Sequence, residues 1–172
     1  MIRSRSVRTK PRNGLAIGDL LAAVLLSELC APSAELWLVS GWLTDIPVLN
    51  NQTGQYDALV GEQRRSHLLL TDVLATIADR GAELHVAIRQ VDHNERFAQR
   101  IIDRVDRGKV SVYRGADLHE KFLVGDDWLM KGSMNFTWNG VQVNEEHIDL
   151  EVGRQNAAQQ RLELRTRWIE VE

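Results

Sequence analysis

The sequence alternates short apolar runs with longer amphipathic segments, and this alternation limits the folds that the chain can adopt. The apolar runs have the length of buried strands, and the longer segments place leucine, valine and isoleucine at helical spacing. This alternation predicts strands over 36–40, 84–88 and 110–113 and helices over 14–30, 63–80 and 94–107. Because such helices must cover the apolar faces of a sheet, we predict an α/β fold with a mixed β-sheet flanked by helices on both faces.

The last third of the chain contains a predicted β-hairpin. Residues 118–124 and 128–134 are strand-forming runs, and the Gly-Asp-Asp sequence over 125–127 is typical of a turn. An alternating strand over 147–152 and a helix over 155–168 complete the predicted domain.

Charge separates a short N-terminal arm from the rest of the chain. Residues 1–12 carry five basic and no acidic side chains, although the whole chain has a net charge of −3. We therefore predict a basic arm over 1–13, either a solvated tail or a contact for phosphates, and one domain over 14–172. Segment 44–61 contains proline, paired asparagine and glycine residues and is predicted to be a long loop.

The sequence favours neither a secretion signal nor a membrane span. The apolar run 20–26 follows basic residues, but Asp19 and Glu28 bracket it closely, as in a buried helix. No stretch approaches the ~18 consecutive apolar residues of a transmembrane helix. The single cysteine, Cys30, suits a reducing compartment. These features predict a cytoplasmic protein.

The candidate catalytic residues lie on the predicted hairpin. His119 and Lys121 are two residues apart, so on a strand they project from the same face. Ser133 and Asn135 have the same spacing at the far end of the paired strand. If the hairpin pairs as predicted, an imidazole nucleophile and several phosphate-binding groups converge at one edge of the sheet.

These segments resemble the phospholipase D-like superfamily. His-Glu-Lys-Phe-Leu-Val-Gly-Asp over 119–126 matches the HxKxxxxD half of its signature, and Gly-Ser-Met-Asn-Phe-Thr over 132–137 matches the GSxNFT half. Asn-Glu-Glu over 144–146 resembles the downstream NxE element. The two halves are separated by five residues, where six is usual, and the signature occurs once. The resemblance covers most of residues 15–170 and implies a phospholipase D-like fold with one motif per chain.

The family mechanism needs two motif copies that face each other, so the resemblance implies a homodimer. One His119 attacks phosphorus and forms a phosphohistidine, while the partner subunit's His119 protonates the leaving oxygen and later activates water. Lys121 and Asn135 of both chains hold the non-bridging oxygens, and Ser133 adds a hydrogen bond.

Two carboxylates complete the implied site. Glu146 orients the imidazole, and the NxE spacing favours it over the adjacent Glu145. Asp126 supports the site through hydrogen bonds, although its position in a turn has an ordinary structural explanation. The family chemistry implies no metal and no other cofactor, because lysines supply the positive charge. The sequence also lacks the CxxC and HxxxH pairs that would indicate zinc.

Other residues with chemical potential have ordinary interpretations. Three histidines have no ligand-like spacing and are predicted to be structural or exposed: His67, His85 and His93. Three tryptophans either pack in the core or stack on bases: Trp42, Trp128 and Trp138. Trp138 directly follows the motif and is expected to lie nearest the substrate.

We therefore predict a metal-independent phosphodiesterase. Small single-motif members of the family are commonly nucleases, some in bacterial defence, so we expect a homodimeric endonuclease that binds and hydrolyses DNA or RNA. One alternative is a phospholipase acting on lipid phosphodiesters, although the polar segment 44–61 is unlike an apolar entry loop. Another is a module that binds nucleic acid or recruits a partner protein with little cleavage of its own. An additional partner protein that activates or targets the chain is a third, weaker expectation.

Overall fold

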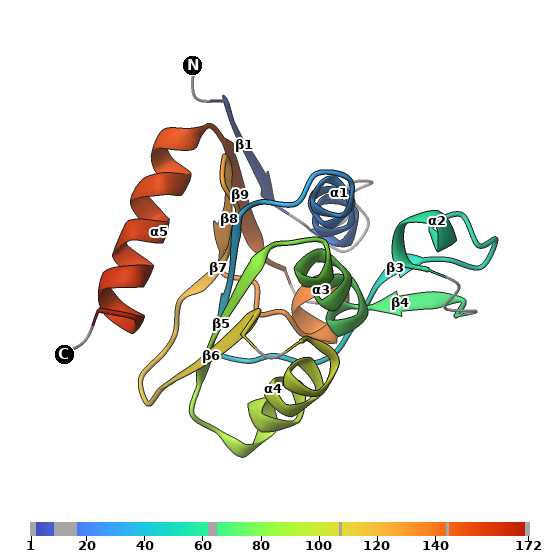
Figure 1. Ribbon diagram of the computed structural model, residues 1–172. Helices are drawn as coiled ribbons and strands as arrows, with labels where there is room; N and C mark the ends of the chain where they lie inside the picture. Colours follow the sequence, from blue (N-terminus) through green and yellow to red (C-terminus); the bar gives the residue numbers. More distant parts are fainter. Residues whose placement is uncertain (1–2, 9–16, 62–64, 107, 144, 171–172) are drawn as a thin grey trace.

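A computed structural model describes residues 3–8, 17–61, 65–106, 108–143 and 145–170 and shows a seven-stranded sheet between two layers of helices (Figure 1). The strands lie in the order β1 (Arg3–Arg8), β9 (His147–Val152), β8 (Trp128–Gly132), β7 (Lys121–Val124), β2 (Glu35–Ser40), β5 (Glu83–Arg89) and β6 (Val110–Gly115). β2, β5 and β6 are parallel, and the other neighbours are antiparallel. The predicted mixed α/β fold is confirmed.

Helices cover both faces of the sheet because consecutive residues of the central strands are apolar, and consecutive strand residues point to opposite faces. α1 (Ile17–Cys30), α3 (Leu70–Asp79) and α4 (Asp92–Arg104) pack on one face, and α5 (Arg154–Trp168) packs on the other (Figure 1). In β2, Leu36 and Leu38 belong to the larger core, whereas Trp37 and Val39 belong to the smaller core that includes Ala157 and Leu164 of α5. All four β2 side chains are fully buried.

The N-terminal arm predicted over 1–13 is in part a strand. Residues Arg3–Arg8 form β1, which pairs antiparallel with β9 at one edge of the sheet. Backbone pairing with an exposed edge needs no apolar pattern, so no periodicity in residues 3–8 indicated this strand. Residues 9–13 lie outside the described part of the chain.

Two further predictions about the region between β2 and α3 were wrong. The predicted loop 44–61 contains β3 (Pro47–Asn50) and the short helix α2 (Asp57–Val60). The helix predicted over 63–80 starts only at Leu70, because β4 (His67–Leu69) pairs with β3 and Asp72 accepts a hydrogen bond from the Leu69 N–H at 3.0 Å. The β3–β4 hairpin projects beyond the side of the sheet (Figure 1).

The hairpin that carries the motif is present, with shorter strands than predicted. Phe122 pairs with Lys131 and Val124 with Leu129 across the β7–β8 turn. β7 begins at Lys121 because its other neighbour, β2, ends at Ser40, the residue that pairs with Lys121. His119 therefore precedes the strand. Among the helices that the structure describes, none combines the length and apolar character needed to cross a membrane.

Candidate active site

The ends of four strands bring the motif segments to one edge of the sheet, the edge along which β2 and β8 end and β7 and β9 begin. β2 ends at Ser40, which pairs with Lys121 at the start of β7. β8 ends at Gly132, which pairs with Ile148 near the start of β9. Because these neighbours are antiparallel, the segments that precede β7, follow β8 and precede β9 all leave the sheet at the same edge.

Gly41, the residue after β2, lies between two of the predicted catalytic residues. A Cβ atom at Gly41 would lie 3.8 Å from both His119 Cα and Asn135 Oδ1, and 3.0 Å from the Leu118 carbonyl oxygen. Lys121 Nζ donates a hydrogen bond to the His119 carbonyl at 2.7 Å. The structure thus brings His119, Lys121 and Asn135 together, and His119 itself is exposed at this edge.

Ser133 and Glu146 meet on the neighbouring strand ends. The Ser133 hydroxyl donates to a Glu146 carboxylate oxygen and accepts the His147 N–H at 3.0 Å. The Ser133 N–H donates to the His147 carbonyl at 3.0 Å. These three bonds fix the start of the GSxN turn against the start of β9. Asn144, the first residue of the NxE element, lies outside the described residues.

Two glycines allow this close packing. A Cβ atom at Gly132 would lie 1.9 Å from the His147 carbonyl oxygen, and one at Gly140 would lie 2.2 Å from the Asn135 carbonyl oxygen. Both neighbours are backbone atoms held by other hydrogen bonds, so neither can move away freely. The close pairing of β8 with β9 therefore requires glycine at the first position of the GSxN sequence. Gly140 likewise lets the short π-helix η1 (Asn139–Val143) pack against Asn135.

Asn94 is a positioning residue that the sequence analysis treated only as the start of a helix. Its side chain is fully buried. Its amide donates to the carbonyls of Gly41 and Arg89, and its Oδ1 accepts the Leu43 N–H, all at 2.9 Å. It therefore fixes the loop that follows β2 beside His119. Asparagine is so common at helix starts that its type alone did not indicate this role.

Asp126 lies away from the other predicted site residues. It occupies the β7–β8 turn, at the opposite end of β7 from Lys121. The rise of a β-strand puts the two residues about 15 Å apart along the chain. Its carboxylate accepts the Ala34 N–H at 2.8 Å and lies 3.9 Å from Arg161 Nη1, and its own N–H donates to Ser33 Oγ at 2.9 Å. These contacts join the hairpin to the start of β2 and to α5, so they support the fold.

Among the other residues singled out, the histidines take the two predicted environments. His67 and His93 are exposed, and His85 is buried with its ring stacked on that of Trp37 at 4.3 Å and near that of Tyr113 at 6.0 Å. Burial lowers the pKa of His85 and outweighs the nearby carboxylates of Glu83 and Glu35, which act in the opposite direction. In the described part of the chain, no group of three or more histidine, cysteine, aspartate or glutamate side chains is arranged to hold a metal ion.

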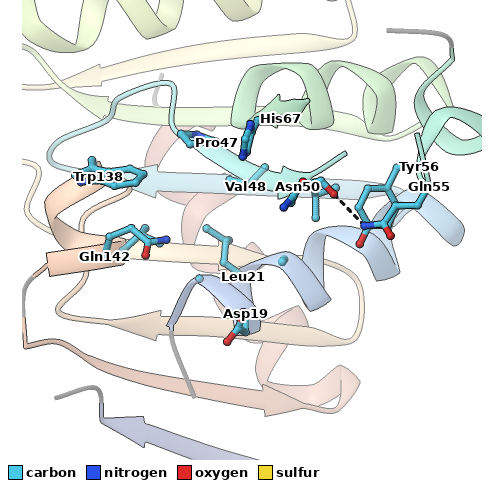
Figure 2. Close-up of a pocket in the computed structure, with 14 residues that line it drawn as sticks. Asp19, Leu21, Pro47, Val48, Asn50, Gln55, Tyr56, His67, Trp138 and Gln142 are labelled. Carbon is cyan, nitrogen blue, oxygen red and sulfur yellow. Dashed lines mark hydrogen bonds between the residues drawn. The ribbon is translucent and has the colours of Figure 1, made fainter. Parts of the chain in front are cut away.

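The tryptophans differ in their surroundings. Trp128 is buried and donates from Nε1 to Glu28 at 2.7 Å, so it is a core residue. Trp42 is 42% exposed with its ring 5.4 Å from that of His93, and Trp138 is 53% exposed. Trp138 lines a pocket of about 440 Å³ between α1, the β3–β4 hairpin and η1. Figure 2 shows this pocket with the residues that line it. The pocket lies beside the motif, and His119 is not among its lining residues.

Both the sequence and the fold of this chain are similar to those of known proteins. A family profile described as "Cardiolipin synthase, PLD-like domain" matches residues 58–168. The fold is similar to that of Nuc, a phospholipase D family member from Salmonella typhimurium, with a TM-score of 0.63 and 13% identity over 95% of this chain and 91% of that one. NucT from Helicobacter pylori gives the same TM-score and identity over 96% and 95% of the two chains.

Larger proteins contain a similar fold. Phosphatidylserine synthase from Haemophilus influenzae matches with a TM-score of 0.62 and 11% identity, over 96% of this chain and 38% of that one. TrmBL2, an archaeal chromatin protein described as having a novel mode of DNA binding, matches with a TM-score of 0.56 and 14% identity, over 99% and 53%. A search of curated proteins by sequence found no match.

Proposed function

The chain belongs to the phospholipase D-like family, and on that premise we propose that it is a metal-independent nuclease that works as a homodimer through a phosphohistidine. The observation that carries this proposal is the convergence of His119, Lys121 and Asn135 around Gly41 at one sheet edge. A nucleophile beside a cation and an amide is the arrangement that in-line attack at a phosphodiester requires.

In the proposed reaction, an imidazole nitrogen of one His119 forms a bond to phosphorus as the ester P–O bond breaks. The partner subunit's His119 gives its proton to the departing oxygen. The same imidazole then takes a proton from water, whose oxygen attacks phosphorus and breaks the P–N bond. The products are one hydroxyl end and one phosphomonoester end, and both histidines return to their starting states.

The neighbouring groups act on charge and position. Lys121 and the Asn135 amide would bind the non-bridging oxygens and stabilise the charge that develops on them. Glu146, held by the Ser133 hydroxyl, would accept a hydrogen bond from an imidazole and select its tautomer. Asp126 would act at a distance, by fixing the hairpin that carries Lys121.

A second chain is proposed because one chain supplies one motif histidine. The chemistry needs a nucleophile and an acid on opposite sides of the phosphorus atom, and the signature occurs once. The exposure of His119 and Ser133 at the sheet edge supports a site completed from outside.

Nucleic acid is the substrate class that the chain favours. Nuc and NucT match this chain over nearly their whole lengths, whereas the chain corresponds to 38% of phosphatidylserine synthase. The loop after β2 is fixed by the buried Asn94, and the pocket beside the motif presents several amide side chains. A lipid phosphodiester shares the same chemistry and is the substrate to test next.

The test is cleavage of single-stranded DNA, double-stranded DNA and RNA by the full chain in EDTA. Wild type is compared with His119→Ala, and Lys121→Ala is compared with Lys109→Ala, a half-buried lysine just before β6 at the opposite edge of the sheet. We expect cleavage that survives EDTA, is lost in the His119 and Lys121 variants, and is retained in Lys109→Ala.

The outcomes separate the candidate functions. Cleavage that persists in His119→Ala would contradict the proposal. A folded wild-type dimer that cleaves phospholipid vesicles and no nucleic acid would support the lipid alternative. Salt-dependent DNA binding without cleavage would support a binding module. TrmBL2 is described as a chromatin protein that binds DNA.

A further inference from the structure

We propose that the pocket beside the motif binds an unpaired nucleobase next to the scissile phosphate by stacking it on Trp138, so that the substrate is single-stranded nucleic acid. This inference rests on the proposed nuclease function and adds a substrate class to it. The ligand is an uncharged, flat heterocycle attached to the same backbone whose phosphate reaches His119.

The pocket has the shape and walls that such a ligand needs. Its volume of about 440 Å³ lies within the ~300–1,000 Å³ range of small-molecule sites. Figure 2 shows Trp138 and Gln142 at one end, Gln55 and Tyr56 at the other, and Leu21 between them on the side of α1. An exposed indole at one end offers a stacking face that every base can use.

The composition of the walls favours a base over a phosphate. Among the described residues that line the pocket there is no lysine or arginine, and the polar side chains include three amides, those of Asn50, Gln55 and Gln142. Amides both donate and accept hydrogen bonds, as the edges of bases do. A phosphate would lack a lysine or arginine here and would share the pocket with the Asp19 carboxylate, whereas Lys121 provides a cation at the sheet edge nearby.

The position of Trp138 couples the pocket to the proposed reaction. Trp138 follows Asn135 by three residues, so their Cα atoms are at most about 11 Å apart. The turn between and after them is held by bonds from the Gly140 N–H to Thr137 Oγ1 at 3.2 Å and from the Val141 N–H to the Thr137 carbonyl at 3.0 Å. The indole is therefore presented on a fixed turn, one that also packs against Asn135 through Gly140.

The opposite wall of the pocket is tied to the same site. Thr44, in the loop from β2 to β3, donates its N–H to the Phe136 carbonyl at 3.0 Å. Leu43 and Phe136 form an isolated parallel β-bridge. Gly18 of α1 lies where an added Cβ would be 3.1 Å from Gln142 Nε2. A strand that places its phosphate at His119 can thus place a neighbouring base in the pocket only if that base is unpaired, since a paired base is enclosed in its duplex.

The test measures binding by His119→Ala protein in EDTA, so that the ligand stays intact. The ligands are a short single-stranded DNA, its duplex, and an abasic sugar–phosphate oligomer of equal length. Trp138→Ala and Trp138→Phe are added to this background, and Leu162→Ala is the control because Leu162 is also 53% exposed but lies on α5. Fluorescence anisotropy gives Kd, and gel filtration gives the oligomeric state.

We expect Trp138→Ala to weaken single-strand binding about 5- to 150-fold, the range of one base–aromatic stack. Trp138→Phe should restore most of the affinity, and Leu162→Ala should bind as the background protein does. The abasic oligomer should bind to both Trp138 variants as tightly as it binds to the background protein, because it has no base to stack.

Three results would overturn the inference. One is an unchanged Kd in Trp138→Ala while the wild-type protein still cleaves nucleic acid, which leaves the proposed function standing. The second is an equal loss of affinity for the abasic oligomer. The third is dissociation of the dimer in Trp138→Ala, which would place the indole at an interface between copies. Wild-type protein that neither binds nor cleaves nucleic acid would refute the proposed function as well.

Discussion

Asn94→Ala should destabilise the protein strongly, because one buried side chain makes three hydrogen bonds. The substitution removes the Asn94 amide from the Gly41 carbonyl and the Leu43 N–H, in a place where Asn94 is 0% exposed. The Arg89 carbonyl loses one of two bonds, since it also accepts the Val91 N–H at 2.9 Å. A net contribution of about 1 kcal/mol for each bond gives about 3 kcal/mol, and the cost of leaving buried groups unsatisfied raises this to about 5 kcal/mol.

The assay is urea unfolding followed by circular dichroism, with Gln99→Ala as the control. Gln99 lies on the same helix but is exposed, and its amide donates to the exposed Asp103, so a change within about 0.5 kcal/mol is expected. Folded Asn94→Ala should also cleave more slowly, because the loop after β2 is released beside His119. A loss of less than about 1 kcal/mol, with full activity, would refute the role given to Asn94.

Two other perturbations test the packing and the electrostatics of the fold. Gly132→Ala should destabilise the protein by about 3 kcal/mol, because its Cβ would lie 1.9 Å from the His147 carbonyl oxygen. At Gly18 an added Cβ would lie 3.1 Å from the flexible Gln142 side chain and 3.4 Å from Val141 Cγ1, so Gly18→Ala should stay within about 1 kcal/mol in the same unfolding assay. Burial lowers the pKa of His85, so the unfolded chain binds more protons and stability should fall as the pH drops below the ordinary histidine value of 6.5. Thermal unfolding at neutral and mildly acidic pH should therefore show a smaller pH dependence for His85→Gln than for wild type, and an identical dependence in both would contradict this account.

The sequence predicted those parts of the fold in which periodicity and burial coincide. β5, β9, α4 and α5 match their predicted segments closely, because alternate or helically spaced apolar residues face a core. The sheet edge at Arg3–Arg8 was missed because an alternation of arginine and serine carries no apolar signal. The β3–β4 hairpin was missed because its short strands lie in a segment rich in turn-forming residues.

The candidate site shows the same division. The spacing of His119, Lys121 and Asn135 placed them at one sheet edge, since strand geometry fixes where such residues emerge. The family motif also grouped Asp126 with them, but a hairpin turn lies at the far end of its strands, and there the Asp126 carboxylate accepts the Ala34 N–H. The buried role of Asn94 depends on contacts between segments some fifty residues apart, which no local pattern contains.

The proposed mechanism requires that His119 become covalently linked to the substrate phosphorus. Mass spectrometry can detect this link after rapid mixing of the protein with nucleic acid in EDTA and an alkaline denaturing quench, because P–N bonds of phosphohistidine break in acid. We expect a nucleic-acid fragment attached to the peptide that contains His119, and no adduct in His119→Ala. An adduct on another residue, or cleavage at the wild-type rate by His119→Ala, would contradict the proposed mechanism.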